Sequence, residues 1–192
     1  MSGLLKGVLG SKIYRTANKG LSGLLSPFID NPYDDPFMRS VWEDVRGDEG
    51  YRALPYLDSK KNITLGVGHL GSERPGFMGI LDSAFTGPNE AEDVSKKDLD
   101  VRVKQVANIL TPSVYENLSE EAKKAVINVH FRGDLQGSDI TRSLIMQGRM
   151  DEAAKEFLDH EEYKKAVRNK KLYGIDSGLI DRFEKNARRL RS

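Results

Sequence analysis

The sequence contains no cysteine, which excludes a disulfide framework and a thiolate zinc site. It also lacks any run of about 18 apolar residues, the length that a transmembrane helix needs. The longest apolar runs near the start, Leu4-Leu5 and Leu24-Leu25, are too short for the core of a signal peptide. We therefore expect no cleavable signal and, with 38% hydrophobic and 31% charged residues, an ordinary globular chain.

Acidic residues are absent from the first 29 positions, which carry a net charge of +4. Residues 166–192 carry +5, so the middle of the chain carries −8 although the whole chain is only +1. Basic ends on an acidic body suggest an anionic partner, such as a cell-wall polymer, a lipid surface or another protein. The alternative is that both ends are simply solvated.

Residues 1–36 form a compositional unit rich in glycine, serine and leucine. Ser-Gly-Leu-Leu occurs at 2–5 and again at 22–25, and the unit ends in a stretch with two prolines and several aspartates, 30–36. Such a segment cannot bury enough apolar surface to order itself. We therefore expect an N-terminal extension over 1–36 and a folded domain over 37–192.

Hydrophobic periodicity predicts one small β-hairpin followed by helices, an α+β arrangement. A first helix, with Phe37, Val41 and Val45 on one face, is expected to end near Gly47 or Gly50. Ser119 is expected to cap a buried helix. The expected strands are 53–57 and 63–67, the loop is 71–89, and the further helices are 90–110, 122–131, 140–147, 151–158, 161–169 and one from 176 or 177.

The segment from Asp48 to His69 places polar side chains where chemistry is expected. Glu49 lies where the first helix ends, Asp58 lies in the turn of the hairpin, and Thr64 lies on the return strand. A helix end facing a hairpin forms a cleft, and glycoside hydrolysis needs one protonated and one ionised carboxyl group. On spacing alone, a capped helix and an Asp in a turn explain these residues better than a catalytic pair does.

This segment closely resembles the catalytic segment of the T-even phage lysozyme family, glycoside hydrolase family 24. The shared frame has Glu-Gly, eight residues between Glu49 and Asp58, five between Asp58 and Thr64, and then Gly-x-Gly-His. A second block, Pro112–Leu118 followed by Ala125–Asn128, resembles the larger lobe of the same family. The resemblance spans about 40–190 and leaves out the first 35–40 residues.

The resemblance implies a lysozyme-like fold, with a small β-hairpin lobe, a larger helical lobe and the active-site cleft between them. It implies a muramidase, which hydrolyses the β-1,4 bond between N-acetylmuramic acid and N-acetylglucosamine in peptidoglycan. Glu49 would be the general acid, Asp58 would hold the attacking water or stabilise the transition state, and Thr64 would help to place that water. No cofactor, metal or nucleic acid is implied. A lytic transglycosylase or an inactive virion protein would not need both Asp58 and Thr64.

Other positions take supporting roles by the same resemblance. Leu70, Phe131 and Ser143 would contact the saccharide, although core packing explains Leu70 and Phe131 equally well. Asn128 would brace Asp48, and Arg182 would pair with Glu49 or Asp48.

Asp98 falls between Val94 and Val101 on the predicted 90–110 helix, so we expect it to face inward and to need a cation or hydrogen-bond donors. The resemblance implies that His69 is this partner, in a structural ion pair. The stretch 130–134, with His130 and Asp134 at its ends, departs from the family pattern and is expected to line or adjoin the cleft. A metal site built from His69, His130 and His160 has no ligand spacing to support it.

The time of action stays open between two phage proteins. A virion-associated lysozyme, tethered to tail or internal proteins through residues 1–36, would act during DNA entry. An endolysin would act late, from the host cytoplasm, and its basic extension would contact a membrane. Either protein would reach its substrate in the host periplasm.

Overall fold

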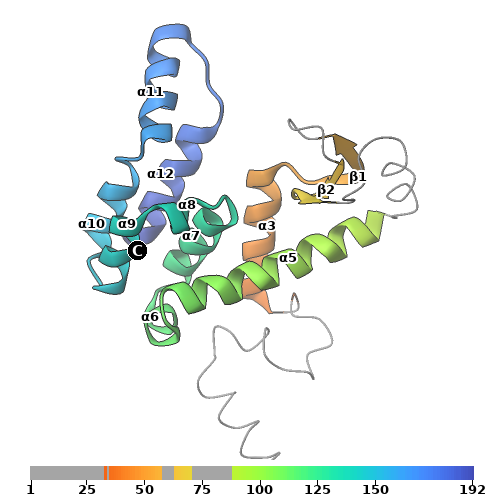
Figure 1. The fold of residues 1–192 in the computed structure, drawn as a ribbon, viewed down its shortest axis with the longest axis horizontal. Coiled ribbons are helices and arrows are strands. Elements are labelled where there is room, and N and C mark those ends of the chain that lie inside the picture. Colours follow the sequence, from red (N-terminus) through yellow and green to blue (C-terminus); the bar gives the residue numbers. More distant parts are fainter. Residues whose placement is uncertain (1–32, 34, 58–62, 71–87) are drawn as a thin grey trace, which may run out of the picture. The chain divides into compact units, whose positions relative to one another are not determined.

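The computed structural model describes residue 33 and residues 35–57, 63–70 and 88–192 (Figure 1). Most of the predicted extension 1–36, the hairpin turn with Asp58 and most of the 71–89 loop lie outside these residues. Two compact units divide the chain. Unit 1 comprises Met1–Val41 and Val106–Ser192, and unit 2 comprises Trp42–Gln105.

Helix α3 (Pro36–Glu49) confirms the first predicted helix. Asp35 caps it, since its side-chain oxygen Oδ1 accepts a hydrogen bond from the Phe37 backbone N–H at 3.0 Å. Its buried face contains the predicted apolar residues together with two more, and the full set is Phe37, Met38, Val41, Trp42 and Val45. The helix ends beside Gly50, so the second of the two predicted end points is correct.

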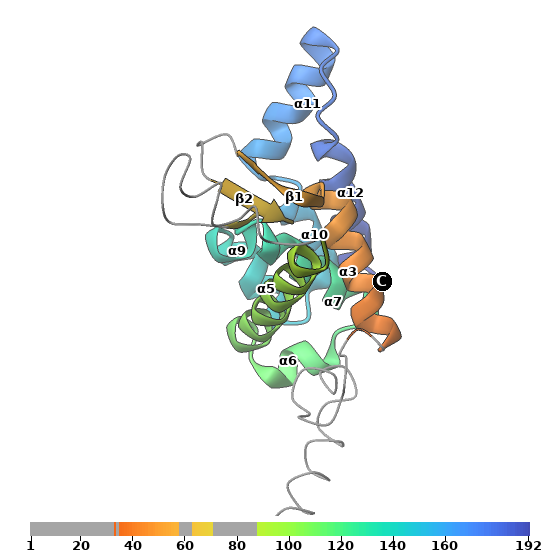
Figure 2. The ribbon, with the colours of Figure 1, turned by 90° about the vertical axis from the view of Figure 1, so that its right-hand side faces the viewer.

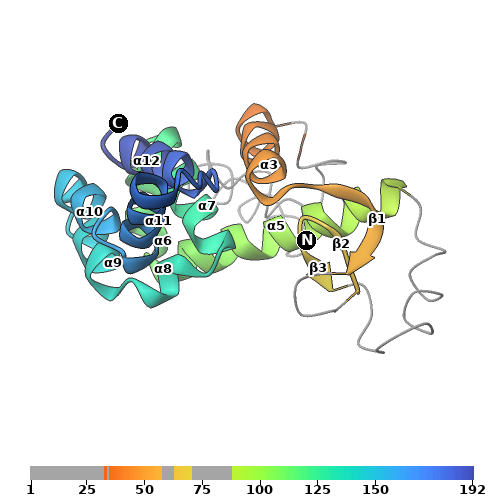
Figure 3. The same cartoon turned by 90° about the horizontal axis from the view of Figure 1, so that it is seen from above.

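Three antiparallel strands follow: β1 (Arg52–Leu57), β2 (Ile63–Gly66) and β3 (His69–Leu70), in the order β1-β2-β3. Figure 3 shows β2 between the other two. All four residues of β2 are buried, as expected for a central strand. The sequence did not predict β3, because a two-residue strand has no periodicity of its own and exists only through its pairing with β2.

Helix α5 (Pro88–Ile109) buries the predicted face, on which Leu99, Val103 and Val106 are fully buried. Leu110, directly after the end of the helix, is fully buried as well. The same face contains Ala91 and Ser95 near the start of the helix. These two small residues allow a strand to approach α5 closely.

Seven helices complete unit 1: α6 (Pro112–Asn117), α7 (Glu120–Phe131), α8 (Asp134–Gly137), α9 (Asp139–Met146), α10 (Met150–Phe157), α11 (Glu161–Tyr173) and α12 (Leu179–Leu190). Ser119 caps α7 as predicted, accepting a hydrogen bond from the Ala122 N–H at 3.0 Å. Helix α7 is buried along most of its length, and α12 packs against it (Figure 2). Phe157 of α10 stacks on Phe183 of α12 with ring centroids 4.7 Å apart.

The stretch 130–134 was expected to line or adjoin the cleft. The side chain of His130 is fully buried within unit 1, so it lines no surface, and the position of the stretch beside the cleft stays a prediction. Arg132 forms an ion pair with Glu162 of α11 at 2.6 Å, and Gly133, with φ +91°, turns the chain from α7 into α8. The residues that depart from the family pattern therefore contribute to the packing and the turns of unit 1. The side chain of Asp134 lies outside the described residues.

None of the helices in the described part of the chain is long and apolar enough to cross a membrane.

Candidate active site

Glu49 stands at the last position of α3, where the chain reverses toward the sheet. Gly50 adopts φ +68°, and the Tyr51 N–H donates a hydrogen bond to the Arg46 carbonyl at 3.2 Å. This is the Schellman arrangement, which ends a helix at a defined residue through a glycine in the left-handed region. The Glu-Gly pair thus has a physical reason, because the glycine makes possible the turn that places the half-buried Glu49 at the helix end.

An aromatic cluster holds this helix end in place within unit 2. The Tyr51 ring meets the buried Trp42 edge-on with centroids 5.9 Å apart, and the Arg46 guanidinium lies 4.9 Å above the Tyr51 ring. Burial raises the pKa of the Tyr51 phenol, with the nearby carboxylate of Glu92 acting in the same direction. Packing on both sides of Glu49 therefore restricts the turn that carries it.

The hairpin supplies the second part of the predicted constellation. Thr64 is buried on β2 and is in register with Tyr56 of β1 and Leu70 of β3. Leu57 is in register with Ile63, so Asp58 follows directly after the last paired residue of β1. Asp58 itself lies outside the described residues, and its separation from Glu49 stays a prediction.

At Gly66, strand β2 of the hairpin packs very closely against helix α5. Gly66 adopts φ +63°, and a methyl group in place of its α-hydrogen would overlap the Ser95 hydroxyl oxygen and lie 2.9 Å from the Ala91 carbonyl oxygen. The Ser95 hydroxyl donates to that carbonyl at 2.7 Å and accepts from the Val67 N–H at 3.2 Å. The first glycine of Gly-x-Gly-His thus lets the strand that carries Thr64 dock on α5.

Ser95 is a structural contact of the Thr64 strand that was not predicted from the sequence. The available signal was the pair of small residues Ala91 and Ser95, four apart on the otherwise apolar face of α5.

Asn128 and Arg182 come together within unit 1, joined by a residue that was not predicted. Arg182 Nε donates to Asn128 Oδ1 at 3.1 Å, and Asn186 Nδ2 donates to the same oxygen at 3.0 Å. Asn128 and Asn186 are buried. The four-residue spacing of Arg182 and Asn186 on α12 was the signal for this network. The predicted contacts of Asn128 and Arg182 with Asp48 or Glu49 stay predictions.

The predicted saccharide contacts occupy different settings. Phe131 is half-buried at the end of α7, and Ser143 is exposed on α9, where its hydroxyl accepts a hydrogen bond from Gln147 Nε2 at 3.0 Å. The backbone of Leu70 belongs to β3, but its side chain lies outside the described residues. Contact of these three residues with a saccharide stays a prediction.

Asp48 is half-buried one position before Glu49. Asp98 is half-buried, but the neighbours proposed for it do not form an apolar wall, because Val101 is exposed. Asp98 therefore flanks the buried face of α5. The side chain of His69 is outside the described set, so the ion pair of His69 with Asp98 stays a prediction.

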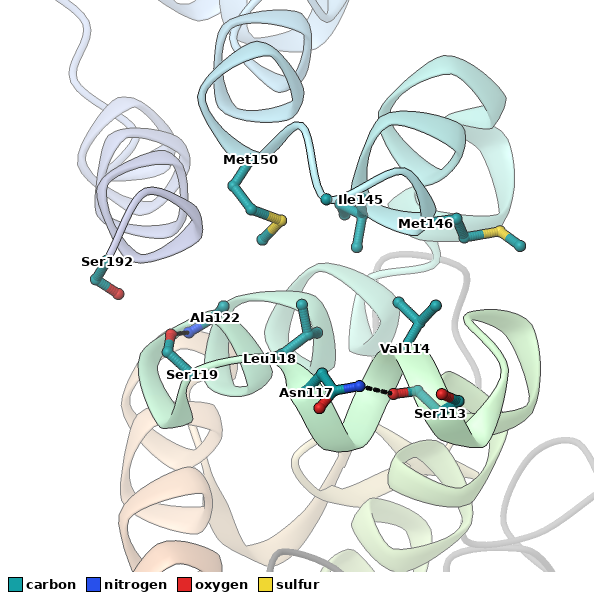
Figure 4. A pocket seen from close by; sticks show the side chains of 11 residues that line it. Ser113, Val114, Asn117, Leu118, Ser119, Ala122, Ile145, Met146, Met150 and Ser192 are labelled. Atoms are coloured by element: carbon teal, nitrogen blue, oxygen red, sulfur yellow. Dashed lines mark hydrogen bonds between the residues drawn. The ribbon is translucent and has the colours of Figure 1, made fainter.

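Unit 1 contains a pocket of about 480 Å³, whose lining differs from that of the predicted site (Figure 4). Ile145, Met150, Val114 and Leu118 lie around it, from α6 to α10, and Asn117 Nδ2 donates to the Ser113 carbonyl at its rim. No charged side chain lines it. It therefore lacks the acid that glycoside hydrolysis requires. The described residues also contain no cluster of three or more acidic or histidine side chains able to hold a metal ion.

Comparison with known proteins agrees with the frame around Glu49. Residues 46–185 match the phage lysozyme family. The chain is also similar to a protein of Dictyostelium discoideum named "Probable T4-type lysozyme 1", with 27% identity over 139 residues, which cover 62% of this chain and 82% of that protein. The family match spans well over half of the chain and includes Glu49, Asp58 and Thr64. The chain belongs to the phage lysozyme family.

Proposed function

We propose that this protein is a muramidase, which hydrolyses the β-1,4 bond between N-acetylmuramic acid and N-acetylglucosamine in peptidoglycan. One observation carries the proposal: Glu49 is held at a Schellman turn, in the same compact unit as the hairpin strand that bears Thr64. A carboxyl group fixed at a helix end beside a hairpin is placed to protonate a leaving oxygen.

In the proposed mechanism, Glu49 donates its proton to the glycosidic oxygen as the bond to the anomeric carbon breaks. Asp58, as a carboxylate, accepts a proton from water on the opposite face of the sugar, and Thr64 helps to hold that water. Water attack from the opposite face inverts the anomeric configuration and requires carboxyl groups roughly 6.5–9.5 Å apart. The family resemblance supports inversion, and we expect the α-anomer as the first product.

Product analysis on purified peptidoglycan tests this reaction. Hydrolysis creates a reducing end on N-acetylmuramic acid, which borohydride converts to the alcohol, and proton NMR at early times reports the anomer formed first. We expect reducible ends and the α-anomer. A 1,6-anhydro product would identify a transglycosylase, and the β-anomer would show that Asp58 acts as a nucleophile.

We further propose that the protein is a phage lysozyme associated with the virion, and that residues 1–36 tether it there. Support comes from the charge of +4 without an acid over the first 29 residues, and from the family match, which begins only at residue 46. The catalytic frame therefore does not include the extension. The alternative, an endolysin whose extension contacts a membrane, uses the same segment differently.

Deletion of residues 2–35 separates the two roles. A tether predicts an unchanged rate on purified peptidoglycan but loss of the truncated protein from purified particles, measured by immunoblot against a capsid standard. A membrane segment predicts unchanged particle content and slower lysis of intact cells. If neither particle content nor lysis changes, both roles of the extension are excluded.

A further inference from the structure

Exposed apolar side chains concentrate at the C-terminal end of α11. Nine large apolar residues in the described part of the chain are exposed, and four of them fall within nine positions, 167–175. The most prominent are Leu172, Tyr173 and Ile175, which are 62%, 70% and 58% exposed. We call these three residues the α11 tip. A cluster of exposed apolar residues on a protein surface marks a contact site more often than scattered single residues do.

Cations that form no ion pair with a described side chain lie next to the α11 tip. Lys164 and Lys170 have acidic partners, Asp159 at 2.8 Å and Asp176 at 2.6 Å respectively. The other cations of α11 are exposed and form no ion pair with any described side chain: Lys165, Arg168 and Lys171. Their charge is therefore available to an external partner.

Helix α11 is anchored at its base and extends outward at its tip. Tyr163 donates a hydrogen bond to Glu184 of α12 at 3.1 Å, and Arg132 pairs with Glu162 at 2.6 Å, both near the helix start. Ala166 is the one residue of α11 that is buried. Figures 1 and 2 both show α11 and the turn after it extending beyond the other helices of unit 1. The α11 tip can therefore reach a flat surface.

We propose that the α11 tip docks on an anionic lipid bilayer. Aliphatic side chains gain free energy by leaving water for the acyl region, and a tyrosine ring is favoured at the headgroup level. Lysine and arginine beside them are attracted to anionic headgroups. A hydrated glycan with carboxylates would attract Lys165, Arg168 and Lys171 equally but offers no apolar phase for Leu172 and Ile175. The apolar tip therefore decides in favour of a bilayer.

Vesicle sedimentation with the full-length protein tests the proposal. We expect binding to vesicles of phosphatidylglycerol and phosphatidylethanolamine, weaker binding to phosphatidylcholine, and loss of binding at high salt. Each neutralised cation should lower the partition coefficient about fivefold, so K165Q/R168Q/K171Q should lower it about 100-fold. The variant L172S/I175S should lower it at least about tenfold.

Matched variants keep the interpretation specific. I140S/V101S removes two exposed apolar side chains elsewhere, and K97Q/K104Q/R191Q removes three exposed cations elsewhere. I140S/V101S should bind vesicles better than L172S/I175S, and K97Q/K104Q/R191Q should bind them better than K165Q/R168Q/K171Q. All variants should hydrolyse purified peptidoglycan at the normal rate. In addition, the fluorescence of Y173W should be quenched by brominated lipids, whereas the buried Trp42 of the parent should not.

Three results would overturn the proposal. The first is that tip variants bind vesicles as well as the parent. The second is that deletion of residues 2–35 abolishes vesicle binding, which would assign the contact to the extension. The third is that tip variants lose binding to purified sacculi while vesicle binding is unchanged, which would assign the surface to the cell wall.

Discussion

Replacing Gly66 with alanine is expected to lower the melting temperature by about 6–12 °C. The added methyl group would overlap the Ser95 hydroxyl and crowd the Ala91 carbonyl, and alanine is strained at φ +63°. Overpacking costs about 1–3 kcal/mol, and the left-handed backbone adds about 1 kcal/mol. A total near 3 kcal/mol corresponds to this shift for a chain of this size.

Gly174 provides the matched control for Gly66→Ala. It adopts φ +69°, but a methyl group there would meet no atom within 4 Å. Gly174→Ala should therefore show only the backbone cost, about 2–4 °C. Ser95→Gly should reduce the cost of Gly66→Ala in a double-mutant cycle, because it removes the overlapping side chain. Equal melting temperatures for Gly66→Ala and Gly174→Ala would contradict the close approach of β2 to α5.

Longer periodic elements were predictable, and the shortest ones were not. The faces of α3 and α5 and the cap at Ser119 follow from residue spacing and side-chain chemistry, which are local properties. The two-residue strand β3 depends on pairing with β2, and α6 and α8 contain only six and four residues. Such elements form through tertiary contacts, which a local pattern does not encode.

The C-terminal end of helix α11 was also not predicted from residue spacing. Its last residue is Tyr173, four positions beyond the expected end. The sequence there is rich in lysine, and its two apolar residues, Leu172 and Tyr173, are adjacent and do not repeat with the period of a helix. The left-handed Gly174 ends the helix, and that glycine was the usable signal.

The positions of the candidate site residues along the chain were predictable, but the hydrogen bonds that support them were not. Glu49 and Thr64 lie at a helix end and on the return strand, as expected. Ser95 and Asn186 were missed because their hydrogen-bond partners are far away in the sequence. Ser95 binds Val67, 28 residues away, and Asn186 binds Asn128, 58 residues away. The full burial of His130 was not predicted, because a histidine has no fixed preference for surface or core and its burial depends on the three-dimensional structure.

Loss of the proposed general acid, Glu49, is expected to have the largest effect on activity. Glu49→Gln keeps the shape of the side chain but removes the transferable proton, so the rate of bond cleavage should fall by about 10²–10⁴-fold. The melting temperature should stay within about 2 °C, because the Schellman turn rests on Gly50 and on backbone hydrogen bonds. Glu43, exposed on the same helix, supplies the control variant Glu43→Gln.

The initial rate of new reducing ends on purified peptidoglycan, compared for the parent, Glu43→Gln and Glu49→Gln, tests the central claim most directly. We expect the Glu43 variant to match the parent and the Glu49 variant to lose at least 99% of the rate while remaining folded by circular dichroism. A folded Glu49→Gln protein that releases reducing ends at near-parental rate would contradict the assignment of Glu49 as the general acid.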